Sequence, residues 1–290
     1  MILVTGSTGN VGSAVVSELR ATGANVRMAV RVPTPGAPGN VGFDFTDPQT
    51  WGPALQGVRS MFLVRPPAIG NVKRDLLPAI SAAREAGVQH VVFLSLQGAE
   101  HNKVVPHATV EAWLRDSGMA WTFVRASFFH QNLSTTHASD VRDRDEILVP
   151  AGGGATAFVD AHDVGAVAAA ALLNPEANAN QAWTVTGPRA LTYEQVAQIL
   201  SAELSRPIRY GHPGVLRYAR HARRALGMPW GMVAVTAAIY TTARLGLAAG
   251  LTDDVHHVLG RAPVDFTEFA HRERNLWIPT RHPATEKDVP

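Results

Sequence analysis

Residues 5–12 read TGSTGNVG, and this stretch decides the expected fold. The apolar run Met1–Thr5 leads into it, and Val11–Thr22 behind it carries apolar residues at helical spacing. A strand that passes through closely spaced glycines into a helix is typical of the phosphate-binding turn in dinucleotide-binding domains. The alternative is an ordinary glycine-rich turn without a ligand.

Each glycine of this stretch has its own task in such a turn. Gly6 permits the tight turn, Gly9 lets the backbone approach a diphosphate, and Gly12 lets the helix pack close to the strand. The helix that follows offers unpaired N–H groups and its positive end to the phosphates. The candidate cofactor contacts in the turn are Gly6, Thr8, Gly9, Asn10, Val11 and Gly12.

Short apolar strands and helices alternate through the first half of the chain. Strands are expected at Asn25–Val30, Ser60–Val64, Val91–Leu96 and Ala120–Arg125, with helices over Arg74–Ala86 and Pro106–Ser117. This alternation predicts an α/β fold with a doubly wound, mostly parallel Rossmann sheet that is covered on both faces. We expect an NAD(P)-binding Rossmann domain over residues 1–150. In residues 151–290 we expect the remaining strands, interleaved with a smaller, mostly helical substrate lobe.

Residues that follow the second and later strands of the predicted sheet indicate which dinucleotide binds. NAD binders carry an acid about 20 residues past the glycines, where it holds a ribose hydroxyl, and here Arg31 stands in that place. Arginine pairs with a 2′-phosphate, so the sequence favours NADP (NADPH), with NAD possible; the alternative is a surface arginine without contacts. Asp44 and Phe45 are candidate adenine contacts or, equally, a turn aspartate beside a core phenylalanine. Arg65, after the strand Ser60–Val64, completes the candidate cofactor contacts.

Composition excludes several classes of function. The chain has 290 residues, 46% of them hydrophobic and 17% charged, which suits a folded protein with a full core. It contains no cysteine, so disulfides, thiol nucleophiles and cysteine-ligated zinc are excluded. One basic cluster, which we interpret as a solvated helix face, contains Arg217, Arg220, Arg223 and Arg224. No long basic run accompanies it, so we expect no nucleic-acid partner.

The segment Trp230–Leu251 is apolar except for threonines and Arg244. An arginine well inside the span argues against a bilayer helix, so we expect a buried or interface helix and no membrane partner. No basic segment with an apolar stretch precedes the strand at Ile2, which favours a cytoplasmic location. The pair His256-His257 near Asp253-Asp254 lacks a third ligand set, so we expect no metal. A monomer or homodimer that binds a small-molecule substrate is expected.

Further segments match one known family through their order and spacing. They are Val91–Ser95 with Gly98, His107–Glu111, Trp121–Arg125 followed by Phe128, Phe129 and Asn132, Phe158–Asp160 with Asp163, Thr186–Pro188, and Pro263-Val264 with Phe266 and Phe269. Together with the glycine turn they resemble the NmrA-like family of atypical short-chain dehydrogenases. The resemblance covers nearly the whole chain and is loosest between about residues 212 and 260.

The resemblance implies a Rossmann domain and a smaller C-terminal lobe, with the substrate between them. The family contains NADPH-dependent reductases of quinones, dyes and related unsaturated compounds, as well as redox-inactive proteins that only sense the dinucleotide. We therefore expect an NADPH-dependent reductase that transfers hydride to a quinone-like or other electron-poor small molecule. The alternative is a redox-inactive NAD(P)-sensing regulatory protein. A third interpretation, a sugar-nucleotide epimerase or dehydratase, is disfavoured because the Tyr-x-x-x-Lys pair is absent.

The catalytic residues of typical short-chain dehydrogenases are only partly present. Those enzymes use Tyr-x-x-x-Lys on a helix and a serine on the preceding strand. Ser95 occupies the serine's place, whereas Lys103 and His107 fall on the places of the tyrosine and the lysine. Pro106 fits the first turn of a helix, so we expect Lys103 to lie outside that helix. The candidate catalytic residues are His107, which also matches a catalytic lysine of isoflavone-reductase-like enzymes, and Ser95.

A histidine in a cleft titrates near neutral pH, so His107 is a candidate proton donor or ribose contact, with Glu111 one turn later to orient it. The alternative is a helix-start histidine with a surface partner. Hydride transfer to a quinone needs little acid help, because a stabilised phenolate forms, so the missing tyrosine fits such an acceptor. Phe128, Phe129 and Asn132 are candidate substrate contacts beyond a strand end; the alternative for the two phenylalanines is a place in the core.

Overall fold

The computed structural model describes residues 1–34, 36 and 38–279, and the chain forms two compact units. The first unit comprises residues 1–129, 159–188 and 251–264. The second comprises residues 130–158, 189–250 and 265–279. Both units are therefore discontinuous in sequence, because the chain passes from one to the other several times.

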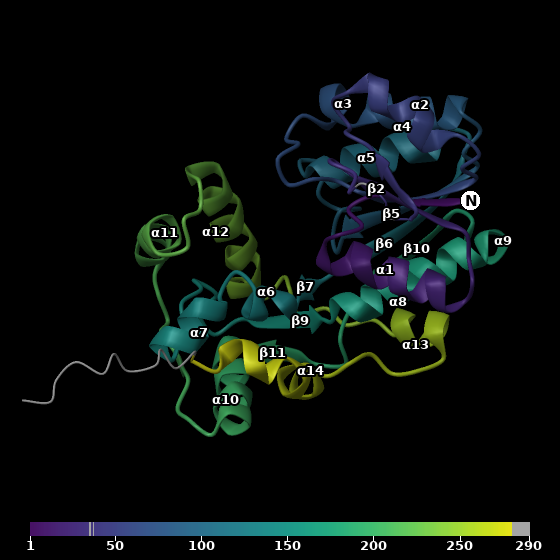
Figure 1. Cartoon of the computed structure of the whole chain (residues 1–290). Helices are drawn as coiled ribbons and strands as arrows, with labels where there is room; N and C mark the ends of the chain where they lie inside the picture. Colours follow the sequence, from purple (N-terminus) through teal and green to yellow (C-terminus); the bar gives the residue numbers. More distant parts are fainter. Residues whose placement is uncertain (35, 37, 280–290) are drawn as a thin grey trace, which may run out of the picture. The chain divides into compact units, whose positions relative to one another are not determined.

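The first unit is built on a seven-stranded sheet in which every pair of neighbours is parallel (Figure 1). The strands are β1 (Ile2–Val4), β2 (Val26–Val30), β3 (Asn40–Gly42), β4 (Ser60–Val64), β5 (His90–Leu96), β6 (Ala120–Ala126) and β10 (Gln181–Val185). Their order is β10-β6-β5-β4-β1-β2-β3, so the direction of winding reverses between β1 and β4. Ligands of doubly wound sheets bind beyond the carboxyl ends of the strands at such a switch point.

Helices cover both faces of this sheet, which confirms the predicted doubly wound α/β architecture (Figure 1). One face packs against α2 (Trp51–Leu55), α3 (Val72–Asp75), α4 (Leu77–Glu85) and α5 (Pro106–Asp116). The other packs against α1 (Asn10–Ala21), α8 (Ala161–Leu173) and α13 (Asp254–Leu259). The remaining elements of this unit are β7 (Phe128–Phe129), α9 (Pro175–Asn178) and the 3₁₀ turn Pro48–Thr50.

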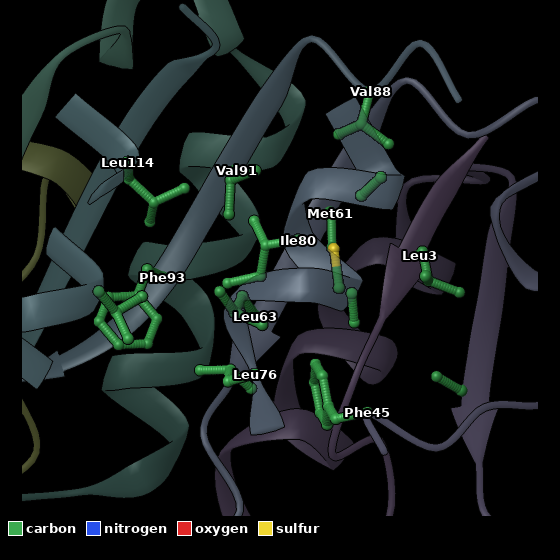
Figure 2. Close-up of a cluster of buried hydrophobic side chains, with 14 of the residues drawn as sticks. Leu3, Phe45, Met61, Leu63, Leu76, Ile80, Val88, Val91, Phe93 and Leu114 are labelled. Atoms are coloured by element: carbon green, nitrogen blue, oxygen red, sulfur yellow. The ribbon is translucent and has the colours of Figure 1, made fainter. Parts of the chain in front are cut away.

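Alternation along the strands supplies both cores, because successive side chains of a strand point to opposite faces. Met61 and Leu63 of β4 join Phe93 of β5 on the α4–α5 face, where Ile80 and Leu114 meet them (Figure 2). On the opposite face Phe62 and Val92 pack with the apolar sides of α1 and α8. The strands are thus buried on both sides, as parallel sheets require.

Glycine brings α1 and α8 unusually close together. A Cβ atom built on Gly165 of α8 would lie 2.5 Å from the Cβ of Ala14 on α1 and 3.1 Å from the backbone nitrogen of Val15. Such distances leave no room for a side chain at residue 165. The helix that carries the glycine turn is therefore held in place by a backbone contact with a helix far along the sequence.

The second unit is mostly helical. Its helices are α6 (Gln131–Ser134), α7 (Ala138–Arg144), α10 (Tyr193–Leu204), α11 (Val215–Arg224), α12 (Trp230–Arg244), α14 (Phe266–Glu273) and the 3₁₀ turn Arg274–Trp277. Its strands are β8 (Glu146–Ile147), β9 (Ala155–Val159), β11 (Ala190–Thr192) and β12 (Arg209–Tyr210). Strands β9 and β11 pair antiparallel, and β8 and β12 pair parallel.

Buried aromatic side chains form the core of the second unit. Tyr193, Phe158 and Phe266 are almost completely buried and lie within ring-contact distance of one another or of neighbouring rings. Trp277 is also buried, and its indole N–H donates to the carbonyl oxygen of Leu133 at 2.8 Å. This bond fixes the end of the described chain to α6.

Two expectations about helices need correction. The helix predicted over Arg74–Ala86 is interrupted at Leu76, because Pro78 sits in the first turn of α4, where its missing N–H is tolerated. The segment from Trp230 is helical only to Arg244, and of α12 only Val233, Tyr240 and Ala243 are buried. Among the described residues, no helix has the length and apolar character needed to cross a membrane.

Candidate dinucleotide site

Thr5 ties the end of β1 to the end of β4. Its hydroxyl donates to the carbonyl oxygen of Phe62 at 2.9 Å and accepts from the N–H of Val64, also at 2.9 Å. Gly6 follows with a φ of 61°, a conformation that side chains disfavour, and a Cβ there would lie 3.3 Å from that of Val64. The glycine turn therefore starts at the switch point between β1 and β4.

The other two glycines differ in the space around them. A Cβ on Gly12 would lie 2.1 Å from the carbonyl oxygen of Gly6, so α1 packs directly on the turn. A Cβ on Gly9 would have one neighbour in the described chain, the same oxygen at an ordinary 3.4 Å. The fold therefore requires glycine at residue 12, whereas residue 9 is open on the side where a ligand can approach.

The start of α1 suits an anion. Gly9 is the N-cap residue, no described side chain caps the helix, and its first turn holds no acid. Thr8 and Asn10 are exposed beside Gly9, whereas the side chain of Val11 belongs to the core, so Val11 has only its backbone to offer a ligand. Unclaimed N–H groups and the positive end of the helix dipole together favour phosphate at this point.

Arg31 follows β2 and is exposed, and no described carboxylate forms an ion pair with it. Asp44 lies near enough for the positive charge of Arg31 to contribute to its lowered pKa, although the hydrogen bonds from Thr46 are the larger causes. Those bonds, from the N–H and the hydroxyl of Thr46, make Asp44 a turn aspartate. Phe45 is buried in the core beside Phe43. The structure thus leaves the guanidinium of Arg31 available and commits Phe45 to packing.

Arg65 and His107 lie close to one another at the end of β4. One Arg65 nitrogen donates to the carbonyl oxygens of Pro66 and Ile69, at 3.1 and 2.7 Å, which holds the guanidinium in place. The Nε atom of Arg65 and the Nδ1 atom of His107 are both buried and have no hydrogen-bond partner among the described residues. Two unpaired polar atoms beside the switch point indicate a place for a polar ligand.

The structure corrects the protonation expected for His107. Its ring stacks on Phe93, with centroids 5.8 Å apart. Burial lowers the pKa of His107 to about 4, and the nearby charge of Arg65 lowers it further than the carboxylate of Glu111 raises it. The imidazole is therefore neutral at neutral pH and does not titrate there, because an apolar, positively charged surrounding disfavours a second cation.

Ser95 is committed to a buried ionic cluster. Its hydroxyl donates to Glu111 at 2.6 Å, and Glu111 also accepts from Arg125 at 3.0 and 2.7 Å and from Arg115 at 3.0 Å. Glu111 is 1% exposed. Its carboxylate therefore orients Ser95 and the two arginines, and no hydrogen bond joins it to His107 as the i,i+4 spacing suggested.

Glu111 stays ionised despite its burial. Desolvation opposes the charge, but hydrogen bonds from Arg125 and Ser95, with the charges of both arginines, leave the pKa of Glu111 below its usual value. Sequence reasoning missed Arg125 as a member of this cluster. Its signal was present, since a charged residue within the apolar strand β6 must find a partner when both faces of the sheet are covered.

The remaining candidate residues lie in three surroundings. Lys103 lies in a turn ahead of α5, which begins at Pro106. Phe129 is half-buried and packs against the core on the α1–α8 face, and Phe128 beside it is also half-buried. Asn132 belongs to the second unit, where it lies half-buried on α6. The structure therefore does not bring Phe129 and Asn132 together in one unit.

The His-Asp group near α13 has local structural contacts. The carboxylate of Asp254 accepts from the backbone N–H of Thr184 at 2.6 Å, and the ring of His257 lies 5.3 Å from that of Trp183. Both contacts join α13 to β10. In the part of the chain that the structure describes, no three histidine or acidic side chains are grouped as metal ligands.

The model of the NmrA-like family matches residues 1–216, three quarters of the chain and all of the glycine turn, β4 and α5. The chain belongs to the NmrA-like family. A relative of this NmrA-like protein is the NAD(P)H azoreductase of Xenophilus azovorans, 38% identical over 283 residues, which cover 93% of this chain and 96% of the relative.

Solved structures of reductases share the fold of this NmrA-like protein. The NADPH-dependent quinone oxidoreductase of Escherichia coli, solved with NADPH, has a TM-score of 0.83 and 25% identity over 94% of this chain and 99% of its own. The triphenylmethane reductase of Citrobacter, solved with NADP(H), has a TM-score of 0.82 and 23% identity over 94% and 99%. The second likeness, at this identity, shows the fold alone.

Proposed function

We propose that this protein is an NAD(P)H-dependent reductase that transfers hydride to an electron-poor small molecule such as a quinone or an azo compound. The observation that carries the proposal is the glycine turn, open at Gly9 and followed by an uncapped helix at the switch point of the sheet. The 38% identity with an NAD(P)H azoreductase over nearly the full length of both chains supports the reaction class.

We further propose NADPH as the preferred cofactor. The unpaired guanidinium of Arg31 stands at the end of β2, where a 2′-phosphate would lie, and arginine binds phosphate through two parallel hydrogen bonds. The likeness to a quinone oxidoreductase solved with NADPH agrees with this preference. Arg65 is proposed as a second cofactor contact, because it follows β4 at the switch point and retains one unpaired N–H.

The chemistry of the site favours an acceptor that needs no acid. NADPH supplies the hydride when it is bound. His107 is neutral at neutral pH, the Ser95 hydroxyl is donated to Glu111, and Glu111 is ionised. These three side chains thus provide no strong proton donor. A quinone tolerates this, because hydride transfer to it gives a stabilised phenolate that takes a proton from water, whereas a simple ketone requires a positioned acid.

In this proposal the three side chains position and pack the reacting groups. Neutral His107, held against Phe93, retains an unpaired Nδ1 atom that can bond to a hydroxyl of the cofactor or the acceptor. Rate enhancement then comes mainly from holding cofactor and acceptor in the geometry for hydride transfer. The Ser95–Glu111–Arg125 cluster supports the β5–α5 wall on which His107 sits.

The test is NADPH oxidation by the pure protein with a panel of quinones, azo dyes, enones and simple ketones. We expect turnover with quinones or azo compounds and none with simple ketones. NADPH binding without oxidation by any acceptor would defeat the reductase proposal and favour a dinucleotide sensor. Absence of NADPH and NADH binding would defeat both, since the glycine turn would then have another purpose.

A further inference from the structure

The segment that contains α11 and α12 has an unusual charge balance. The whole chain carries 26 basic and 24 acidic residues, nearly equal numbers. Residues 204–252 contain no aspartate or glutamate but seven arginines, which are Arg206, Arg209, Arg217, Arg220, Arg223, Arg224 and Arg244. Positive charge therefore concentrates in one part of the second unit, and its position in the fold decides whether it is available to a partner.

One side of each helix is anchored inside the second unit. Tyr240 of α12 bonds through its hydroxyl to Nε2 of buried His137 at 2.8 Å, and His221 of α11 lies 2.9 Å from the carboxylate of buried Asp140. The two helices lie side by side, joined by a 2.8 Å hydrogen bond from Tyr218 to Thr236 (Figure 1). These polar contacts fix which sides of α11 and α12 face inward.

Both helices also carry exposed apolar and basic groups. Leu216 is 88%, Trp230 64% and Val235 55% exposed, and Ile239 continues the apolar side of α12. Exposed arginines lie in the second half of α11, and within the described chain no carboxylate pairs with Arg220, Arg223 or Arg224. We call this surface the α11–α12 surface; it consists of Leu216, Arg220, Arg223, Arg224, Trp230, Val235 and Ile239.

The basic and apolar residues of the α11–α12 surface are together complementary to an anionic lipid surface. We propose that this surface docks the protein on an anionic phospholipid bilayer, with Trp230 and its apolar neighbours in the headgroup region and the arginines on lipid phosphates and carboxylates. Exposed apolar groups beside unpaired basic residues are typical of helices that lie in the membrane interface, and tryptophan favours that depth. Basic residues gain further from the negative potential of anionic lipids.

The geometry limits the attachment to the membrane surface. Helix α12 has 15 residues, and at about 1.5 Å per residue it is shorter than the roughly 30 Å of a bilayer core. This inference does not depend on the reductase proposal, because the surface lies in the second unit and contains none of the proposed cofactor contacts. The sequence argued against a helix that crosses the bilayer, and this inference agrees with that, but it replaces the expectation of no membrane partner by contact with the membrane surface.

Other occupants fit this surface less well. A symmetric contact with a second copy of the chain would bring like charges together, because the segment holds arginines and no acid to pair with them. Nucleic acid would use the arginines but would leave Leu216, Val235 and Ile239 exposed to water. An anionic lipid surface satisfies both groups at once.

The test is sedimentation of the full chain with vesicles of phosphatidylcholine alone or of phosphatidylcholine mixed with phosphatidylserine. We expect binding to the mixed vesicles, weakened by salt, and little binding to phosphatidylcholine. Removal of one guanidinium should lower the affinity for the mixed vesicles about fivefold, so the double variant Arg223→Gln/Arg224→Gln should bind them about 25-fold more weakly. Arg59→Gln/Arg84→Gln, with the same charge change in the first unit, should bind like wild type.

A second variant tests the apolar contribution. Trp230→Ser should weaken vesicle binding, whereas Val104→Ser, which removes an exposed apolar group of the first unit, should not. No binding of wild type to the mixed vesicles overturns the proposal, as does an equal loss of binding in the variants of the α11–α12 surface and in their control variants. A dimer that Trp230→Ser dissociates, without vesicle binding by wild type, would assign the surface to a second copy instead.

Discussion

Two polar regions of the first unit have opposite designs. At the glycine turn, backbone N–H groups lie at the start of an uncapped helix, and no described side chain claims them. In the Ser95–Glu111–Arg125 cluster, each charged group bonds to another group of the same cluster. The first region is free to bind a ligand, whereas the second already satisfies itself. Ser95 occupies the place of a catalytic serine in the dehydrogenase motif, but its contacts do not suit acid–base chemistry. The glycine turn matches its motif and also has the free groups that binding needs.

This difference has a physical origin. A phosphate site can be built from backbone groups, so it needs only glycines and a helix start and depends little on side-chain partners. A proton donor must keep a suitable pKa, which neighbouring charges decide. The residues around His107 and Ser95 remove that possibility at neutral pH, because Arg65 and burial disfavour the imidazolium and Arg125 keeps Glu111 ionised.

The largest expected effect comes from the glycine turn, where Gly9 leaves room for a ligand and Gly12 leaves room for the packing of α1. Gly9→Val should reduce dinucleotide affinity by at least about 100-fold while the protein stays folded, because the valine occupies the approach to the phosphates. Gly12→Val should instead prevent folding of the turn, since its Cβ would overlap the carbonyl oxygen of Gly6. Circular dichroism and NADPH titration of both variants measure the contrast. Full affinity in folded Gly9→Val would remove the turn from the cofactor site.

The next effect tests whether the buried cluster is structural. Glu111→Ala leaves the arginines unpaired and should lower the free energy of unfolding by about 3–5 kcal/mol, as expected for one partner removed from a buried ion pair. In protein that remains folded, NADPH affinity should stay within a few-fold of wild type. Urea unfolding and cofactor titration check both statements. If Glu111→Ala lost turnover without losing stability, Glu111 would have a catalytic role, and the cluster would no longer contrast with the glycine turn as a purely structural region.

We expect Arg31 to bind NADPH selectively, whereas we expect Arg65 to contact NADPH and NADH alike. Arg31→Ala should weaken NADPH binding by about 1.5–3 kcal/mol and leave NADH binding unchanged, because one charge-assisted contact with the 2′-phosphate is lost. Arg65→Ala is the matched control and should weaken both cofactors alike, since it lies by the switch point and not at the ribose phosphate. Equal affinity of wild type for the two cofactors would refute the proposed preference.

Burial of His107 also predicts how stability depends on pH. The folded state lowers the pKa of His107 to about 4 from 6.5, so the unfolded chain binds a proton in this range and the folded protein does not. Stability contributed by the neutral ring is therefore complete above pH 6.5 and is lost as the pH falls toward 4. Replacing His107 with Gln should flatten this slope by at most about 1.4 kcal/mol per pH unit. Urea titrations across the range measure it, and a slope unchanged in His107→Gln contradicts the assigned burial.

The smallest effect concerns turnover. His107→Gln retains a hydrogen-bonding group without a titrating ring, and turnover should fall by less than about tenfold, below the usual contribution of a general acid. His107→Ala should raise the cofactor constant more than it lowers turnover, as expected for a positioning residue. Between pH 6 and 8 neither variant should alter the shape of the profile. A wild-type limb near neutrality that vanishes in His107→Gln would restore the proton-donor interpretation.

Local and periodic signals predicted the parallel sheet, the glycine turn and the start of α5 at Pro106, because strand alternation, glycine spacing and helix-start proline are properties of neighbouring residues. Other features depend on contacts across the sequence. The pairing of Arg125 with Glu111 and the effect of Arg65 on His107 require the strand order, which brings the ends of β4, β5 and β6 beside α5. The roles of Phe128, Phe129 and Asn132 stay predictions.

The contact between Gly165 and Ala14 has a consequence for how the protein is made. Helix α1 is translated before α8, which packs against one side of it and follows only after part of the second unit has been translated. Domains generally fold as units during synthesis, and contacts distant in sequence form slowly. This side of α1 therefore stays without its partner helix while more than a hundred residues are translated. Interruption of synthesis before residue 165 would release a chain whose first helix lacks the contact with α8, so that apolar surface is left exposed to chaperones.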